Sequence, residues 1–296
     1  MTYRQWQEKY LRELGGHYPE DEIRSVFELV LDLGLGVGRT AFHLNGMNSC
    51  SEQEDEQLEN YLQRLIQKEP VQYVLGKCHF YGWEVEVGPG VLIPRQETEE
   101  LVAWIVEDWR GEGMLRIADF GTGSGCIAIS LAKSLGGSEV WGIDISGQAL
   151  EIARRNAGLQ GVELRGVEAD MLAMGAADWP DSVDIMVSNP PYVRREEAGR
   201  MAAHVLDFEP HEALFVEAAD PLIFYEAVLR LAGSRLAQNG AIYFEINEAF
   251  GQEMIALCHK HGFLSTELRK DLNGKDRMIK ASKHRALITP EGAPVA

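Results

Sequence analysis

The stretch from Leu115 to about residue 281 alternates short apolar runs with amphipathic segments, and this alternation limits the possible folds more than any other feature. The apolar runs that fit strands lie near residues 115–119, 139–143, 162–167, 183–188, 240–246, 263–269 and 277–281. The helical segments lie near residues 124–135, 147–158, 221–237 and 249–261. Strands that alternate with helices form a mostly parallel, doubly wound sheet, so the sequence predicts an α/β domain with seven strands.

The first 75 residues lack this alternation and are predicted to form a helical bundle. Apolar residues recur at helical spacing over Arg4–Leu14, again from Pro19 to Gly34, and again between Ser51 and Pro70. Ser51 followed by Glu54 is the pattern of a capping box, which marks the start of the third helix. We expect the bundle to recognise a partner or to cover the next domain.

Residues 76–95 are predicted to form a β-hairpin that links the two domains. Phe80–Val87 has strand composition, Gly88-Pro89-Gly90 is a turn signal, and Val91–Ile93 resumes an extended pattern. A helix from about Glu97 to Trp109 follows. The predicted boundaries are therefore a bundle at 1–75, a hairpin at 76–95, a main domain at 96–284 and a flexible tail at 285–296.

Composition and charge narrow the classes of function. The chain has 45% hydrophobic and 25% charged residues, and a net charge of −18 that opposes unaided binding to a nucleic-acid backbone but suits a basic protein partner. The four cysteines form no CxxC pair, which favours reduced thiols in a cytoplasmic protein over disulfides or a zinc site. No apolar run approaches the length of a membrane span, and the N-terminus lacks a signal-peptide pattern.

A glycine-rich loop follows the first predicted strand of the main domain. Gly121-Thr122-Gly123-Ser124-Gly125 would let a ligand approach the backbone closely and would present the N–H groups of the next helix. The spacing is GxGxG rather than the GxGxxG of dinucleotide-binding folds. A nicotinamide-dependent oxidoreductase is therefore disfavoured.

Acidic residues end the next two strands. Asp144, about 20 residues after the glycine loop, can accept hydrogen bonds from both ribose hydroxyls of a nucleoside, although it also fits the N-cap of the following helix. Asp170 can accept from an adenine amino group while Met171 packs on the ring, although a solvated strand end is the plain alternative. We interpret these residues, with the glycine loop, as a nucleoside site.

The fourth strand of this domain ends in Asn189-Pro190-Pro191-Tyr192. The prolines make a stiff turn that cannot continue the sheet, which leaves carbonyl acceptors beside the amide of Asn189 and the ring of Tyr192. Such a corner can hold a planar, weakly nucleophilic NH2 group, whereas an isolated Asn-Pro-Pro would be read as a capped turn. The glycine loop, both acids and this corner are expected at one carboxyl edge, where open α/β sheets bind ligands.

These motifs, in order and spacing, resemble those of class I S-adenosylmethionine-dependent methyltransferases that act on planar nitrogens. The residues that carry the resemblance are Gly121–Gly125, Asp144 and Asn189–Tyr192. The resemblance implies a Rossmann-like methyltransferase sheet. Because the Asn-Pro-Pro-Tyr tetrapeptide is shared with DNA adenine and RNA guanine methyltransferases, it does not define the substrate.

Segments outside these motifs are more specific. Glu69–Gly76, Leu92–Glu99 and Phe208-Glu209-Pro210 are similar to segments of the peptide chain release factor glutamine N5-methyltransferases, a similarity that runs to about Ser282. Gln96 stands where that family often has proline or arginine. The resemblance implies methylation of the glutamine side-chain amide in the Gly-Gly-Gln motif of release factors.

The resemblance also implies roles at the site. S-adenosylmethionine would be the cofactor and S-adenosylhomocysteine its product, with Asn189 bordering both cofactor and substrate. The Asn189 side-chain oxygen and the Pro190 carbonyl would accept the two amide protons, while Pro191 and Tyr192 complete the substrate pocket. No metal, nucleic acid or membrane is expected to take part, and we expect a monomer.

Two alternatives remain open at this stage. A nucleic-acid amino methyltransferase would use the same tetrapeptide on a base, but the acidic balance and the absence of a basic appendage disfavour it. A catalytically inactive adaptor that binds a translation factor would not need the glycines, Asp144 and Asn189, all of which are intact.

Overall fold

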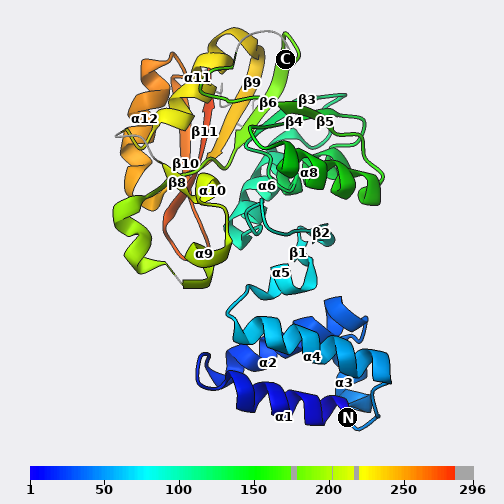
Figure 1. Cartoon of the computed structure of the whole chain (residues 1–296). Helices are drawn as coiled ribbons and strands as arrows, with labels where there is room; N and C mark the ends of the chain where they lie inside the picture. The colour runs from blue at the N-terminus through cyan, green and yellow to red at the C-terminus, as the bar shows by residue number, and fades with distance from the viewer. Residues whose placement is uncertain (175–178, 202, 217–219, 284–296) are drawn as a thin grey trace, which may run out of the picture. The chain divides into compact units, whose positions relative to one another are not determined.

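The computed structural model describes residues 1–174, 179–201, 203–216 and 220–283 and divides the chain into two compact units (Figure 1). The first unit contains Met1–Ile93 together with Ala198–His211, and the second contains Pro94–Glu197 and the chain from Glu212 onward. The predicted tail at 285–296 lies outside the described residues. Among the described residues, no helix combines the length and the apolar character needed to cross a membrane.

The first unit is helical, and amphipathic stripes form its core. Its helices in chain order are α1 (Tyr3–Leu14), α2 (Glu20–Leu29), a π-helical turn η1 (Val30–Gly34), α3 (Arg39–Asn45), α4 (Glu52–Ile66), α5 (Val71–Leu75) and α9 (Ala203–Phe208). Tyr10, Phe27 and Phe42 stack edge to face in this core. Burial of such aromatic residues contributes much of a small core's stability.

The predicted capping box of the third helix is confirmed, whereas the end of the second helix differs in type from the prediction. Ser51 and Glu54 form the expected capping box, and α4 starts directly after it. The second predicted helix does reach Gly34, but its last turn from Val30 is π-helical. The short helices α3 and α5 were not predicted, because each is shorter than the window in which helical periodicity becomes visible.

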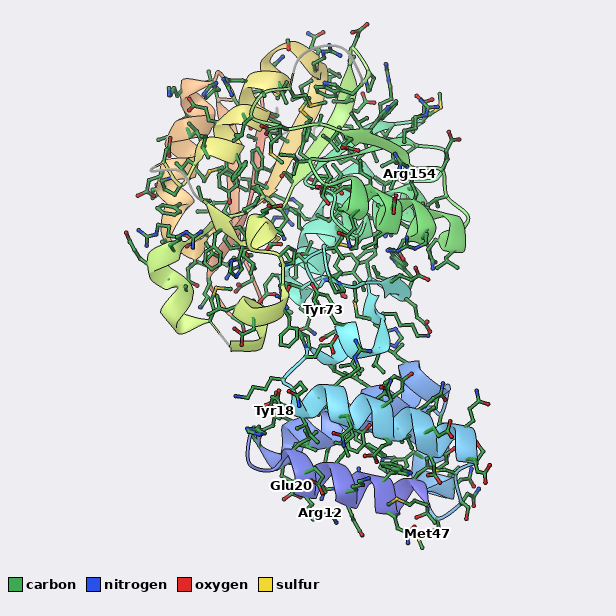
Figure 2. The ribbon with its side chains drawn as sticks, viewed as in Figure 1. Arg12, Tyr18, Glu20, Met47, Tyr73 and Arg154 are labelled. Carbon is green, nitrogen blue, oxygen red and sulfur yellow. The ribbon has the colours of Figure 1, made fainter. Side chains whose placement is uncertain are left out.

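The hairpin is present, but the predicted turn is wrong. Strand β1 (Lys77–Phe80) pairs with β2 (Trp83–Glu86), so the turn lies at Tyr81-Gly82 rather than at Gly88–Gly90. Both turn residues have positive φ, the conformation that two-residue hairpin turns require. Tyr73, labelled in Figure 2, precedes the hairpin, and its hydroxyl donates to the Val91 carbonyl at 2.6 Å. This bond fixes the chain that follows the hairpin, which is not a strand.

The second unit contains a seven-stranded sheet in the order β10-β11-β9-β6-β3-β4-β5. The strands are β3 (Arg116–Phe120), β4 (Glu139–Asp144), β5 (Arg165–Glu168), β6 (Val183–Ser188), β9 (Leu236–Glu245), β10 (Ser265–Lys270) and β11 (Asp276–Ser282). The strands from β9 to β5 in this order are mutually parallel. Strand β11 runs antiparallel to its neighbours β9 and β10, so β10 at the sheet end has the same direction as β9. This confirms the mostly parallel sheet predicted from the alternation.

Helices cover both faces of this sheet. They are α6 (Gln96–Trp109), α7 (Cys126–Ser134), α8 (Gly147–Gln160), α11 (Ile223–Arg235) and α12 (Gly251–Lys260). Ile242 and Phe244 of β9 share a core with α11 and α12, whereas Tyr243 between them contacts Trp104 of α6 on the opposite face. Because side chains alternate along a strand, the two faces are buried independently.

The chain between Tyr192 and α11 contains several short helices and strands. Strand β7 (Val193–Arg194) pairs in parallel with β8 (Phe215–Val216), and between them lie a 3-10 helix η2 (Arg195–Arg200), α9 and α10 (His211–Leu214). Within the first unit, buried Glu209 accepts a hydrogen bond from the Ile93 N–H at 3.1 Å. This bond joins the two stretches of the first unit, 198–211 and the end of 1–93.

Candidate active site

The glycine loop has the backbone that the sequence predicted. Gly121, Gly123 and Gly125 have φ of +72°, +54° and +79°. A Cβ on Gly123 would meet nothing within 4 Å, whereas one on Gly125 would lie 3.1 Å from Cβ of Ala153 on α8. Gly125 therefore allows α7 and α8 to pack closely, and Gly123 leaves open space in which a ligand can reach the backbone.

Buried polar groups hold the loop in place. The Thr122 hydroxyl donates to Asp119 Oδ2 at 2.7 Å, and Nδ2 of Asn156 on α8 donates to the Ser124 carbonyl at 2.9 Å. Asp119 is fully buried, which raises its pKa to about 7, while the Thr122 hydroxyl acts in the opposite direction. Asp119 was not predicted as a site residue, although it is an acid within the apolar strand that leads into a glycine loop.

Asp144 binds the same loop from the next strand. Its Oδ2 accepts the Gly123 N–H and its Oδ1 accepts the Ser146 N–H, both at 2.9 Å. The N-cap of α8 is Ser146, whose side chain accepts from Ala149, so the alternative that Asp144 caps this helix is wrong. Burial raises the pKa of Asp144, and the backbone N–H groups oppose that rise. A carboxylate has about four lone-pair sites, so Asp144 retains acceptor capacity for a ligand hydroxyl.

Asp170 and Met171 follow β5 at the same edge. Asp170 Oδ1 accepts the N–H of Leu172 at 2.8 Å and stabilises its own turn. A Cβ on Gly121 would lie 3.6 Å from the Met171 methyl, so Met171 lies against the glycine loop. Their roles toward an adenine ring remain predictions.

Asn189 emerges beside the glycine loop. Ser188 of β6 pairs with Phe120 of β3, and the Ser188 hydroxyl donates to the Phe120 carbonyl at 2.6 Å. Gly121 and Asn189 therefore leave neighbouring parallel strands at one edge. The chain turns from β3 toward β4 on one side and returns to β6 on the other, so this edge is the topological switch point where open α/β sheets bind ligands. Pro190 is buried there, and Pro191 is half-buried.

Two residues behind the Asn-Pro-Pro-Tyr corner were also missed. Asn189 Nδ2 donates to Thr98 Oγ1 on α6 at 3.2 Å, and that hydroxyl lies 2.6 Å from Glu245 Oε2. The Tyr192 hydroxyl donates to Glu245 Oε1 at 3.0 Å. Burial raises the pKa of Glu245, and burial with the adjacent carboxylate raises that of Tyr192. The available signal was that Glu245 ends an apolar strand.

Asn247 fixes the chain that follows the corner. Its Nδ2 donates to the Tyr192 carbonyl at 3.3 Å and to Glu197 Oε2 at 3.2 Å. Glu197 in turn accepts the Arg194 N–H at 3.0 Å. The backbone on the far side of Tyr192 is thus anchored to the end of β9.

The sheet order and the loop, acid and amide at its switch point define a class I methyltransferase. A Methyltransferase small domain model matches residues 101–217, and a PrmC N-terminal domain model matches residues 2–76. The solved structure of a T. thermophilus 16S rRNA N2 methyltransferase (RsmC), in complex with AdoMet and guanosine, shares the fold at 18% identity, with a TM-score of 0.52 over 70% of this chain and 50% of that one.

Curated relatives define the family more narrowly. The chain is 41% identical to a release factor glutamine methyltransferase of Flavobacterium psychrophilum, over 95% of this chain and 99% of the relative. It is 40% identical to one of Bacteroides thetaiotaomicron, over 93% and 98%. The chain belongs to the release factor glutamine methyltransferase family.

Proposed function

We propose that this enzyme transfers a methyl group from S-adenosylmethionine to the side-chain amide nitrogen, N5, of the glutamine in the Gly-Gly-Gln motif of translation release factors. The observation that carries the proposal is the match to release factor glutamine methyltransferases over nearly the full length of both chains. The placement of Asn189 next to the glycine loop at the switch point supports it.

The glycine loop and Asp144 would form the cofactor side of the site, which suits a nucleoside that carries an amino-acid substituent. Open space at Gly123 and the positive φ of Gly121 leave backbone accessible, and Asp144 is a half-buried acceptor held at that loop. When bound, S-adenosylmethionine supplies a methyl group already activated by its sulfonium charge. The residues of this chain therefore need chiefly to bind and align the two reactants.

Asn189 and Pro190 would form the substrate side of the site and would supply hydrogen-bond acceptors for a planar amide. An amide nitrogen is a poor nucleophile, because its lone pair is delocalised into the carbonyl. Oδ1 of Asn189 and the carbonyl of Pro190 would accept the two amide protons, which orients the NH2 group and favours positive charge developing on nitrogen. Tyr192 would pack on the amide plane, and because its pKa is raised it stays a neutral phenol that donates to Glu245.

Mass spectrometry of a purified release factor, incubated with this enzyme and S-adenosylmethionine, tests the proposal. We expect a gain of one methyl group on the glutamine of Gly-Gly-Gln and none when that glutamine is replaced by alanine. Duplex DNA and ribosomal RNA serve as parallel substrates with labelled methyl. Methylation of a base with none on the release factor would instead establish a nucleic-acid amino methyltransferase.

A further inference from the structure

A buried polar chain lies behind the proposed catalytic amide. Glu245 ends β9 and is 1% exposed, and Thr98 near the start of α6 is 3% exposed. Both belong to the second unit with Asn189 and Tyr192. The carboxylate receives hydroxyls on both oxygens, Thr98 at 2.6 Å and Tyr192 at 3.0 Å. Burying a carboxylate costs free energy unless hydrogen-bond donors or positive charges compensate for the lost hydration.

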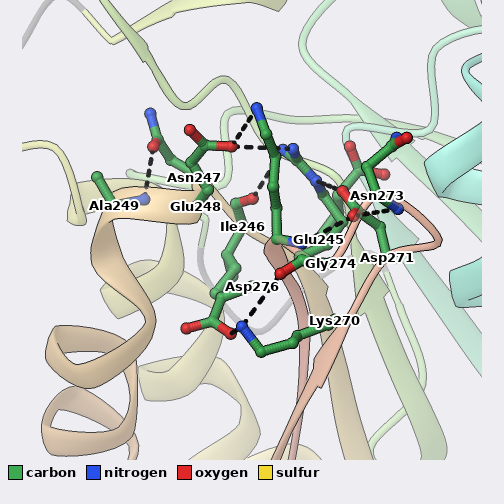
Figure 3. Close-up of polar contacts among 12 residues, drawn as sticks. Glu245, Ile246, Asn247, Glu248, Ala249, Lys270, Asp271, Asn273, Gly274 and Asp276 are labelled. Carbon is green, nitrogen blue, oxygen red and sulfur yellow. Dashed lines mark hydrogen bonds and ion pairs between the residues drawn. The ribbon is translucent and has the colours of Figure 1, made fainter.

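The hydrogen bonds from Thr98 and Tyr192 compensate for part of this cost, and the positive charge of Arg277 adds to them. Figure 3 shows the end of β9, from Glu245 to Asn247, beside the turn between β10 and β11 that carries Asp271. The guanidinium of Arg277, the second residue of β11, donates to the Ile246 carbonyl at 3.3 Å and to Asp271 at 3.1 Å. Its positive charge favours the ionised form of Glu245.

For an ionised Glu245, which accepts both hydroxyls, the number of protons fixes the direction of each hydrogen bond. An ionised carboxylate can only accept, so Thr98 and Tyr192 must both donate to Glu245. The single hydroxyl proton of Thr98 is then committed, and Oγ1 can only accept from Asn189. The group of Asn189 that faces Thr98 at 3.2 Å must therefore be its NH2, which turns Oδ1 away from Thr98.

We propose that Glu245 and Thr98 are positioning residues for methyl transfer, which lock the Asn189 side-chain amide so that its oxygen is the atom offered to the substrate. This inference rests on the proposed function, because the acceptor role of Asn189 is part of it. A flipped amide would present NH2 to the substrate NH2, and two donors facing one another cannot orient a lone pair. Glu245 acts on Asn189 through Thr98, it also accepts the Tyr192 hydroxyl, and it touches no reactant itself.

The first test compares two replacements of Thr98. Thr98→Ser keeps a hydroxyl, whereas Thr98→Val keeps the shape and removes the acceptor. We expect kcat for release factor methylation within about threefold of wild type for Thr98→Ser and at least about tenfold lower for Thr98→Val, the scale of one net hydrogen bond. The affinity for S-adenosylmethionine, measured by calorimetry, should stay within about twofold in both. Equal kcat in both variants would overturn the proposal.

The second test reverses the hydrogen-bond direction and remains informative if Thr98→Val fails to fold. Asn189→Asp puts an acceptor opposite Thr98, whose proton is committed to Glu245, so kcat should fall by about 100-fold. Adding Glu245→Gln provides a donor to Thr98, which frees the Thr98 proton for Asp at 189. We expect the double variant to be about tenfold more active than Asn189→Asp, a coupling expected of residues in one network.

The outcomes distinguish three cases: a hydrogen-bond effect through Thr98, relief of charge repulsion between two carboxylates, and an incorrect proposed function. Losses that simply multiply in the double variant would overturn the positioning role. A recovery that persists when Thr98→Val is added would also overturn it, since relief of charge repulsion alone would then explain the gain. A wild-type enzyme that methylates no release factor would refute the proposed function together with this inference, whereas an active wild type with multiplying losses refutes the inference alone.

Discussion

Asn189 is the residue on which methyl transfer should depend most. Asn189→Ala removes an acceptor fixed before the substrate arrives, and loss of one such preorganised group lowers kcat by about 10²–10³-fold. Binding of S-adenosylmethionine should be largely retained, because the glycine loop and Asp144 remain in place. Methylation kinetics on a release factor, with cofactor affinity from calorimetry, measure both quantities.

Asp144→Ala is the matched control for Asn189→Ala, because it should weaken cofactor binding more than it lowers the rate. It removes a charged acceptor from the cofactor edge, and hydrogen bonds to charged groups contribute about 1.5–3 kcal/mol each, so the dissociation constant should rise by roughly 10-fold or more. Rates at saturating cofactor should change less than in Asn189→Ala. Asn189→Ala activity within a few-fold of wild type, or unchanged cofactor affinity in Asp144→Ala, would contradict the assignments.

Asp119 gives the fold a pH dependence that its amide variant should lack. Burial raises its pKa from 3.8 to about 7 in the folded state. Between these values the unfolded chain releases the proton that the folded chain retains, so wild-type stability is lost as pH rises from about 4 to 7. Asp119→Asn does not titrate and still accepts from Thr122. The variant should therefore gain stability relative to wild type over this range.

Urea unfolding at pH 4.5, 6 and 7.5 without cofactor measures that difference. A difference in unfolding free energy that stays constant with pH would show that Asp119 titrates alike in both states.

Residues with a local pattern could be predicted, and residues with distant partners could not. The glycine loop and the Asn-Pro-Pro-Tyr corner are continuous in sequence, and their meeting follows from parallel strands. Thr98 and Glu245 are 147 positions apart, and nothing in either neighbourhood signals the hydrogen bond between them. The nucleoside contacts of Asp144, Asp170 and Met171 remain predictions.

At the scale of elements, the packing of α7 on α8 depends on a missing side chain. Gly125→Ala would place a methyl 3.0 Å from Ile129 and 3.1 Å from Ala153 at φ +79°. The strained φ costs about 1–2 kcal/mol and overpacking about 1–3 kcal/mol more. We expect a clear fall in the melting temperature of the cofactor-free enzyme.

Gly123→Ala is the control for that substitution. It meets the same kind of strained φ but open space, so it should destabilise the fold less and weaken cofactor binding instead. Equal melting temperatures for the two variants would mean that α8 can shift to admit the methyl group.

Long periodic elements were predicted well, and short ones were not. The order of the seven strands of the main sheet and of the helices that cover it matches the prediction, because most of these elements span enough residues to show their period. The two-residue strands β7 and β8 and the four-residue helix α10 were not predicted. The hairpin turn was misplaced, since Gly88-Pro89-Gly90 is a stronger local signal than Tyr81-Gly82. Tyrosine seldom adopts positive φ, and only the register of β1 against β2 makes it do so here.

At the scale of the whole molecule, each unit buries its own core, and ligand binding should stabilise one of them. The aromatic core of the first unit lies within residues 3–75, while the glycine loop and Asn189 belong to the second. A ligand raises the stability of the cooperative unit that binds it. Calorimetry should resolve two transitions, and S-adenosylmethionine should raise the midpoint of only one.

Trp6 lies in the core of the first unit. A change in its environment therefore marks the transition whose midpoint S-adenosylmethionine should leave unchanged. A single transition that shifts as a whole with cofactor would mean that the two units unfold together.

The hydrogen bond between Glu209 and the Ile93 N–H limits how chimaeras of two related enzymes can be built. Because the first unit also contains segment 198–211, more than a hundred positions downstream, a crossover at a single junction near residue 93 would separate the two partners of this hydrogen bond. A chimaera that takes its N-terminal region from one parent should therefore also take the 198–211 insert from that parent.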